Sequence, residues 1–366
     1  MKIEIIKDKF LDAVVQAERV SGKHVSLPVL SSVIIEASGR NVIVKSTNLD
    51  VGVEITIPAK VEKEGIVAIP SSIIKAFLGT VDQGKNVFLE NEGVICRVVV
   101  GQNEASFNTI SSDDFPVIPK VSSGKNFTII AKEFLSGLRS VLWSAAVSTI
   151  KPELSSVYIH EENDDLVFTA TDSFRLAERK IKAKKIRGFD PILIPFKNAL
   201  EIVHTFESFA GELDINISKN QLSILADGIH LSSRVVDGTF PDYRQIIPKE
   251  FHTEATILKQ DFSQALKLSS LFSDNLNQVT ISIDVPKKTL GIFTKNNEVG
   301  ESKQIIKGAI EGESISLSFN HRYIFDCLQS IDGESIVLKV AGAGKPLVIS
   351  PASNNSFTYL VMSMNR

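Results

Sequence analysis

The chain contains one unit of about 125 residues three times, and the three copies fill its 366 residues. Each copy opens with a strand-like run and a helix, and Phe10, Phe134 and Phe262 mark the same point in it, 124 and 128 residues apart. A second helix start recurs at intervals of 125 residues, at Pro70, Pro195 and Asn320. A period this long indicates tandem domains, because solenoid repeats span only about 20–50 residues.

The repeat predicts three domains, at 1–123, 124–252 and 253–366. Within each copy, short apolar runs separated by turn residues indicate strands, and two stretches with apolar residues at three-to-four spacing indicate helices. Two helices with about eight strands define an α+β unit, in which helices pack on one face of an antiparallel sheet. The predicted strands include Asn41–Ser46, Val87–Glu90, Ile95–Val100, Asp165–Thr171, Gln221–Ala226 and Ser335–Val340.

Charge is balanced along the whole chain. The net charge is −3, and the three copies carry 13 basic and 15 acidic, 16 and 17, and 11 and 11 residues. A nucleic-acid binder usually carries a clearly basic domain. Any contact with an anionic polymer would therefore use one locally basic face.

The sequence argues against an enzyme, a metal site or a bound cofactor. Gly79–Lys85 has the spacing of a phosphate-binding loop, but it follows a predicted helix and precedes a strand, which is the reverse of the required order. The six histidines show no metal-binding spacing, and two cysteines cannot build a four-cysteine zinc site. Cys96 and Cys327 lie in apolar stretches and are expected to be buried free thiols in a reducing cytoplasm.

Two further observations bound the class of protein. No apolar run approaches the roughly 18–20 residues of a membrane-spanning helix, and the charged N-terminal segment is not a signal peptide. From the residues alone, three alternatives stay open: a shape built by symmetry, a tandem-domain ligand-binding or scaffolding protein, and a hydrolase with an unrecognised site.

Four segments read together resemble one family. They are Ser26–Leu30 (SLPVL), Ala170–Ala177 (ATDSFRLA), Val236–Pro248 (VDGTFPDYRQIIP) and Tyr359–Arg366 (YLVMSMNR). Together with the chain length and the triple repeat, they resemble the bacterial DNA polymerase III β subunit family, the sliding clamps. The resemblance covers the full chain.

The resemblance implies a fold and a function. Members are head-to-tail dimeric rings in the cytoplasm that encircle duplex DNA without sequence preference and act as processivity factors without catalysis or cofactors. Their partners are the clamp loader, the replicative polymerase subunit and repair polymerases, which bind through short peptide motifs. A ring needs no tight contact with DNA, and weak phosphate attraction leaves it free to slide.

The resemblance also implies a partner-peptide site between the second and third domains. Its alternating terminal methionines suit varied apolar ligands, and an arginine can bind peptide carbonyls or a carboxylate. A free apolar C-terminus would fray, so something should hold it. The implied wall consists of Leu154, Thr171, Ser173, Phe174, Arg175, Leu176, Pro241, Ile246, Leu360, Met362, Ser363 and Met364.

Two further sets of residues are implied in the same way. DNA contacts are expected at Lys23, His24, Ser72, Ser148, Lys151 and Lys197. For ring closure, the edge strand Asn103–Ile110 with Phe107 would meet an apolar patch formed by Ala265, Leu268 and Phe272.

The chain departs from the family pattern inside the implied peptide site. Ser173 and Phe174 stand where the family commonly has glycine and histidine. Ser363 and Asn365 stand where it commonly has proline and arginine. Phe174 would make the site more apolar, so these departures bear on whether the family's usual peptide fits unchanged.

Overall fold

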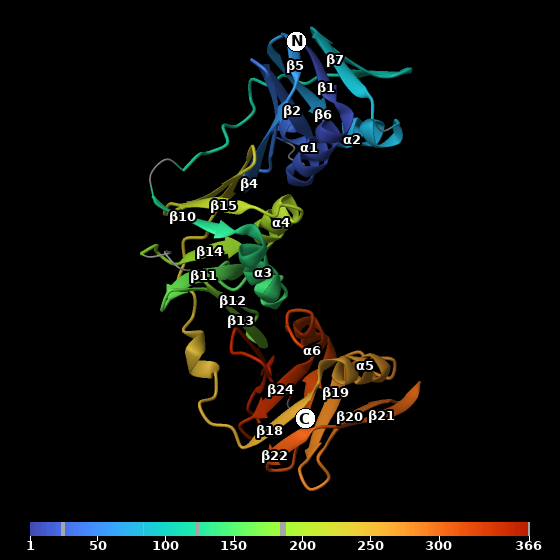
Figure 1. Ribbon diagram of the computed structural model, residues 1–366. Helices are drawn as coiled ribbons and strands as arrows, with labels where there is room; N and C mark the ends of the chain where they lie inside the picture. Colours follow the sequence, from blue (N-terminus) through green and yellow to red (C-terminus); the bar gives the residue numbers. More distant parts are fainter. Residues whose placement is uncertain (23–25, 83, 122–123, 184–187, 365–366) are drawn as a thin grey trace. The chain divides into compact units, whose positions relative to one another are not determined.

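The computed structural model describes residues 1–22, 26–82, 84–121, 124–183 and 188–364 (Figure 1). The chain divides into two compact units. The first comprises Met1–Lys132 and Lys197–Val235, and the second comprises Glu133–Phe196 and Val236–Arg366. The middle repeat therefore contributes to both units.

The first unit contains two antiparallel sheets. The order of the five-stranded sheet is β5 (Lys60–Lys63), β1 (Lys2–Ile6), β7 (Asn86–Glu92), β8 (Ile95–Val100), β9 (Asn103–Asn108). The order of the eight-stranded sheet is β10 (Lys125–Ile130), β15 (Glu212–Ile217), β16 (Gln221–Ala226), β17 (Ile229–Arg234), β4 (Val51–Pro58), β3 (Asn41–Thr47), β2 (Ser32–Ser38), β6 (Gly65–Pro70). The β17–β4 pair joins the second repeat to the first.

The second unit is built in the same way. The order of its nine-stranded sheet is β14 (Ile192–Pro195), β11 (Ser156–Glu162), β12 (Asp165–Thr171), β13 (Arg175–Lys182), β26 (Phe357–Val361), β25 (Leu347–Pro351), β24 (Ser335–Val340), β18 (Thr253–Leu258), β22 (Ala309–Gly312). The order of its four-stranded sheet is β21 (Gly300–Lys307), β20 (Thr289–Asn296), β19 (Gln278–Asp284), β23 (Ile315–Asn320). The β13–β26 pair joins the second repeat to the third.

Six α-helices in the described ranges follow the repeat, two in each copy. Each begins at the residue after a strand ends, so the predicted strand–helix order is confirmed in all three copies. Their bounds are α1 (Lys7–Val20), α2 (Ser71–Thr80), α3 (Ala131–Val141), α4 (Phe196–Phe206), α5 (Lys259–Ser270) and α6 (His321–Leu328). Three short 3-10 helices are η1 (Pro28–Ser31), η2 (Leu142–Ser144) and η3 (Tyr243–Ile246).

The repeated phenylalanines explain why the copies fold alike. Phe10, Phe134 and Phe262 are 0–2% exposed in the first helix of each copy. Burying one such ring contributes about 1.5–3 kcal/mol. In the second unit the Phe134 ring meets Phe168 edge-on, at a centroid distance of 5.5 Å. The recurring ring thus fixes each first helix in its core.

The predicted strands are confirmed, but two are longer than predicted: β3 ends at Thr47 rather than Ser46, and β7 spans Asn86–Glu92 rather than Val87–Glu90. Asp165–Thr171, Gln221–Ala226 and Ser335–Val340 are strands with the bounds expected from the sequence. The Gly79–Lys85 segment connects α2 to β7, with Gln83 outside the described residues, so its order is that of a helix end and turn. Cys96 and Cys327 are buried free thiols. No helix within the described ranges is long and apolar enough to cross a membrane.

Candidate functional site

The strand pair β13–β26 forms the frame of the candidate peptide site in the second unit. Leu176 lies opposite Leu360, and Arg175 lies opposite Val361. Leu176 and Leu360 are 0% and 1% exposed and belong to one apolar cluster with Leu193, Phe240, Tyr243 and Val348. These two expected wall residues therefore lie in the core of the second unit and not at its surface.

The turn between β12 and β13, together with the two strand residues that flank it, carries four of the expected wall residues. The Oδ1 atom of Asp172 accepts hydrogen bonds from the N–H groups of Phe174 and Arg175, at 2.9 and 3.0 Å. The Thr171 hydroxyl accepts from the Ser173 N–H and donates to the Arg175 carbonyl. This network fixes a tight turn in which Ser173 has a φ of 77°, the left-handed region that favours glycine.

Arg175 is held by three neighbours. Its Nη1 donates to Asp326 at 2.7 Å, and its Nε donates to Asp172 at 3.0 Å. Its guanidinium carbon lies 4.4 Å from the centroid of the Tyr323 ring, a cation–π contact. Only 11% of the side chain is exposed.

The backbone of the C-terminal segment after β26 is hydrogen-bonded to the β12–β13 turn and to β23. The Met362 N–H donates to the Phe174 carbonyl at 2.8 Å, and the Met364 N–H donates to the Ser318 carbonyl at 2.7 Å. The apolar terminus is thus held, as expected from its composition. Asn365 lies outside the described residues.

The segment between β17 and β18 borders the same cluster. The Tyr243 hydroxyl donates to the buried carboxylate of Glu178 on β13, and Arg244 reaches His160 and Glu162 at 3.1 and 3.0 Å. Burial and the nearby Arg244 lower the pKa of His160 to about 4, so its imidazole is neutral and accepts the arginine N–H. These contacts anchor η3, which carries Ile246.

Exposure separates the expected wall residues into three groups: buried, exposed and half-buried. Thr171, Leu176 and Leu360 are buried, whereas Phe174, Ile246 and Met362 are 62%, 47% and 37% exposed. Pro241 and Ser173 are exposed, and Leu154, Ser363 and Met364 are half-buried. The backbone of Leu154 bonds to Ala146 and Lys151 in a separate loop. The directly bonded exposed pair is Phe174 with Met362.

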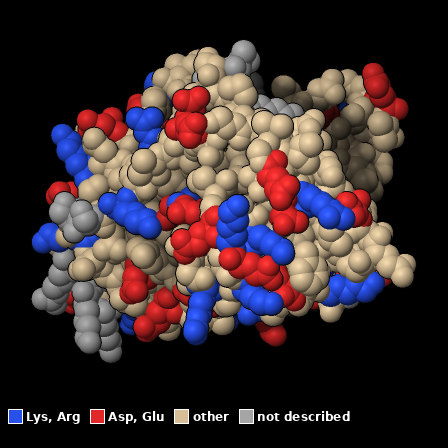
Figure 2. All heavy atoms as spheres, turned by 90° about the horizontal axis from the view of Figure 1, so that it is seen from above, with Lys and Arg blue, Asp and Glu red and all other residues tan. Residues whose placement is uncertain are grey.

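The expected DNA contacts lie on separate elements. Ser72 is exposed in the first turn of α2 and Lys197 in the first turn of α4, both in the first unit. Ser148 and Lys151 are exposed on the loop after η2 in the second unit. Lys23 and His24 lie outside the described residues. Figure 2 shows positive and negative side chains intermingled over the face in view, in keeping with the balanced sequence.

The expected ring-closing strand is an edge strand. β9 is the last strand of the five-stranded sheet, and β21 is the last strand of the four-stranded sheet. The Phe107 ring meets Phe77 edge-on at 5.9 Å and is 6% exposed. Ala265 is also buried, whereas Leu268 is exposed and Phe272 is half-buried.

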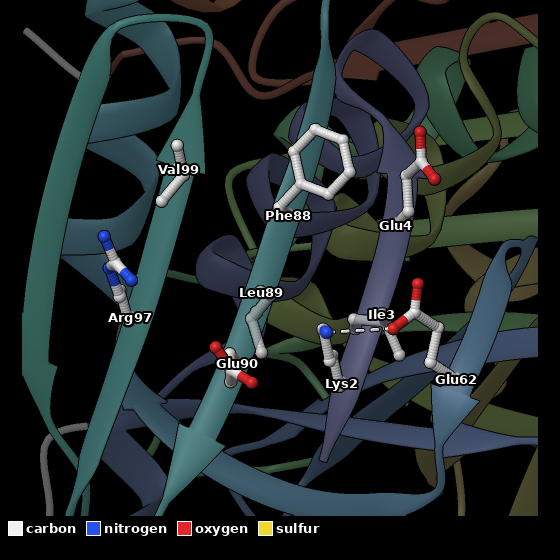
Figure 3. A pocket seen from close by; sticks show the side chains of 9 residues that line it. All are labelled: Lys2, Ile3, Glu4, Glu62, Phe88, Leu89, Glu90, Arg97 and Val99. Carbon is white, nitrogen blue, oxygen red and sulfur yellow. Dashed lines mark ion pairs between the residues drawn. The ribbon is translucent and has the colours of Figure 1, made fainter.

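The solvent-facing side of the five-stranded sheet has a shallow hollow (Figure 3). Both of its cations are paired: Lys2 lies 3.0 Å from Glu62, and Arg97 lies 2.5 Å from Glu104. Phe88 lies opposite Val99 on the neighbouring strand. Cross-strand pairs of opposite charge and of aromatic with branched residues stabilise a sheet, so we assign this hollow to the sheet itself.

Sequence reasoning missed two glutamates at the repeat junctions, whose side chains are 12% exposed for Glu54 and 9% for Glu178. Glu54 on β4 lies opposite His230. Its Oε2 atom lies 3.4 Å from His230 Nδ1 and forms an ion pair with Lys120 Nζ at 2.8 Å. Glu178 on β13 lies opposite Thr358 and binds Tyr243. The two are 124 residues apart, which is the period of the repeat. This equal spacing is the feature of the sequence by which the two glutamates could have been found.

Comparison with known proteins agrees with this architecture. Models of the DNA polymerase III beta subunit match three times: the N-terminal domain over residues 1–119, the central domain over 128–242 and the C-terminal domain over 244–365. The beta sliding clamps of Staphylococcus aureus and Staphylococcus epidermidis are 25% identical over 371 residues, covering 99% of this chain and 98% of each relative.

Solved structures show the same fold. The sliding clamp of Bacillus subtilis has a TM-score of 0.95 at 24% identity and covers 100% of this chain and 99% of that one. The sliding clamp of Bartonella birtlesii bound to griselimycin has a TM-score of 0.94 at 24% identity, with 100% of both chains covered. The fold is therefore three tandem clamp domains. The chain belongs to the DNA polymerase III beta subunit family.

Proposed function

We propose that this protein is a DNA sliding clamp: a cytoplasmic, non-catalytic homodimeric ring that encircles duplex DNA and tethers the replicative polymerase and repair proteins. In this proposal the clamp domains span 1–123, 124–252 and 253–366. The clamp loader and the polymerases bind the surface around Phe174 and Met362 through short peptides.

The observation that carries the proposal is a strand junction that occurs twice within the chain. β4 and β13 are equivalent strands in the first two repeats, and each pairs with the last strand of the next repeat, β17 or β26. The third repeat has the equivalent strand β21, and the first repeat has the equivalent last strand β9. Both of these are edge strands. One strand of each kind is thus left for a second copy of the chain.

The register of the two internal junctions predicts the register of the third. The equivalent strands β4, β13 and β21 each have a charged residue four positions before their last residue. These residues are Glu54, Glu178 and Lys303, respectively. The second residues of β17, β26 and β9 are His230, Thr358 and Glu104. Since Glu54 faces His230 and Glu178 faces Thr358, the same register sets Lys303 opposite Glu104 of the second copy.

The same register supports an apolar contact at this junction. It sets Gly300 opposite Phe107 of the second copy. A Cβ atom on Gly300 would lie 3.9 Å from the Phe272 ring, so the glycine leaves the space beside that ring open. Phe107 would then meet Phe272, one of the residues expected to form the opposing patch. Because β9 and β21 differ, the interface is head-to-tail, and two copies close it into a ring.

The balanced charge supports a topological hold on DNA. A protein that neutralises many phosphates binds tightly and loses affinity steeply with salt, whereas a ring needs only a few weak contacts. We propose Lys23, His24, Ser72, Ser148, Lys151 and Lys197 as those contacts.

The decisive experiment compares DNA forms. The protein, loaded onto a nicked circular plasmid by its clamp loader, should stay bound through gel filtration and be lost when the plasmid is linearised by a restriction enzyme. The control is a linear plasmid blocked at both ends by bound protein, on which retention should return. Equal retention on circular and open linear DNA would contradict the proposal.

A further inference from the structure

Arg175 lies in the expected peptide site, yet its head group is engaged inside the second unit. Asp326 of α6 and Asp172 of the turn each accept one of its N–H groups, and the Tyr323 ring covers one face. The side chain is 11% exposed. A ligand therefore has little access to this guanidinium group.

The carboxylate of Asp172 links Arg175 to the shape of the turn. Its Oδ2 atom accepts from Arg175 Nε, while its Oδ1 atom accepts from the N–H groups of Phe174 and Arg175. An arginine that fixes this carboxylate also fixes the two backbone groups that the carboxylate holds. The turn includes Ser173 at a positive φ, so it needs such support.

The turn in turn positions the exposed apolar pair. The carbonyl of Phe174 accepts the hydrogen bond from the Met362 N–H at 2.8 Å. A continuous series of contacts thus runs from Asp326 through Arg175 and Asp172 to Phe174 and Met362. Charge-assisted bonds such as the first link are stronger than neutral ones.

We propose that Arg175 and Asp326 are positioning residues for the peptide site. They hold Phe174 and Met362 in their binding arrangement through Asp172, and the peptide need not touch either of them. This inference rests on the proposed function, because it assumes that the surface around Phe174 and Met362 binds a partner peptide.

The chain supplies a matched control on the same strand. Arg179 of β13 donates to Asp332 at 2.7 Å, the same distance as the Arg175–Asp326 bond. Arg179 lies opposite Phe357, at the end of the strand pair away from the turn. Asp326→Ala and Asp332→Ala therefore each remove one arginine–aspartate pair from β13, but only the first lies in the series that reaches the turn.

The first measurement is affinity for a fluorescent synthetic peptide that copies the C-terminal tail of the replicative polymerase subunit. We expect Asp326→Ala to weaken binding about tenfold and Asp332→Ala by less than about twofold. In the Asp326→Ala background, adding Arg175→Ala should weaken peptide binding by less than about a further twofold, because the two changes remove the same contact. Asp326→Asn keeps an acceptor for Nη1 and should retain most of the affinity. Unchanged affinity in Asp326→Ala, or a full Arg175→Ala effect in that background, would overturn the proposal.

The second measurement needs no peptide. Hydrogen exchange followed by mass spectrometry should show the Phe174 and Met362 amides exchanging about tenfold faster in Asp326→Ala than in the wild type or Asp332→Ala. Equal exchange in the three proteins would overturn the positioning role. If the wild type binds no peptide while the exchange difference appears, the proposed partner site fails and the positioning of the turn stands.

Discussion

Glu54 and Glu178 occupy the same place in successive repeats, and each holds the segment that leads into the next repeat. Glu54 binds Lys120 in the segment between β9 and β10, and Glu178 binds Tyr243 in the segment between β17 and β18. Each also lies on the strand that pairs with the following repeat. A carboxylate acceptor at each junction thus fixes both the strand pairing and the path of the connecting chain.

The first junction should lose stability in acid. Contact with His230, together with Lys120 and Lys45, outweighs burial and lowers the pKa of Glu54 to about 2 from 4.5. Because the folded pKa is depressed, this contribution is complete above pH 4.5 and disappears as pH falls toward 2. A shift of this size corresponds to about 3 kcal/mol.

Urea unfolding at pH 7 and pH 3 measures this loss. Glu54→Gln should make the first unit less stable at pH 7 and reduce the change between the two pH values. An unaltered pH dependence in Glu54→Gln would rule out this carboxylate as the source.

Ser173→Gly should stabilise the second unit. The left-handed conformation costs a residue with a side chain about 1–2 kcal/mol in the folded state, and glycine avoids this cost. Glycine also increases the conformational entropy of the unfolded chain, which offsets part of the stabilisation. We expect a net gain of about 0.5–1 kcal/mol in thermal or urea unfolding. Ser173→Ala is the control, because it keeps the Cβ atom and removes only the hydroxyl. An equal gain in both variants would assign the effect to the hydroxyl.

Removing residues 362–366 should abolish peptide binding and leave the dimer intact. The cut is made after Val361, because Leu360 and Val361 are buried in β26 and support the strand pairing. Loss of the exposed Met362 and the half-buried Met364 takes away apolar surface, so affinity for the polymerase tail peptide should fall more than about tenfold. Fluorescence anisotropy measures the affinity, and native mass spectrometry checks the dimer. Undiminished binding would exclude the terminal segment from the site.

Reversing one charge at the proposed β9–β21 junction between two copies should weaken the ring, and reversing both charges should restore it. Lys303→Glu would set two carboxylates opposite each other at each of two interfaces and weaken dimerisation about fivefold to tenfold. Adding Glu104→Lys restores opposite charges. Lys345→Glu, on the exposed β24–β25 turn, is the control for net charge. Sedimentation of diluted samples measures the dimer, and failure of the double variant to recover would refute the register.

Charge reversal at Lys23 and Lys197 together should shorten retention on nicked circular DNA. Each lost phosphate contact reduces the salt dependence of binding as well as its strength. Retention at two salt concentrations tests both, with Lys345→Glu again as the control. Unchanged retention would exclude this face from the DNA path.

The sequence predicted the repeat, the strands and the helix starts because those depend on local patterns. Phe10, Phe134 and Phe262 could be found from spacing alone, and their burial follows from it. The engagement of Arg175 by Asp326 could not, since the two lie 151 residues apart and meet only through the pairing of β13 with β26. Leu176 and Leu360 are buried, whereas Phe174 is exposed. The sequence could not predict this contrast either, because it depends on which face of the β13–β26 pair each residue occupies.

The difference between β9 and β21 has a practical consequence. A chain carrying only Lys303→Glu and a chain carrying only Glu104→Lys should each be poor at pairing with themselves. Mixed together, they form one unaltered and one reversed junction, and both have opposite charges. The two chains would therefore select each other, so rings with a single working copy of any surface could be assembled by placing a second change in just one of them.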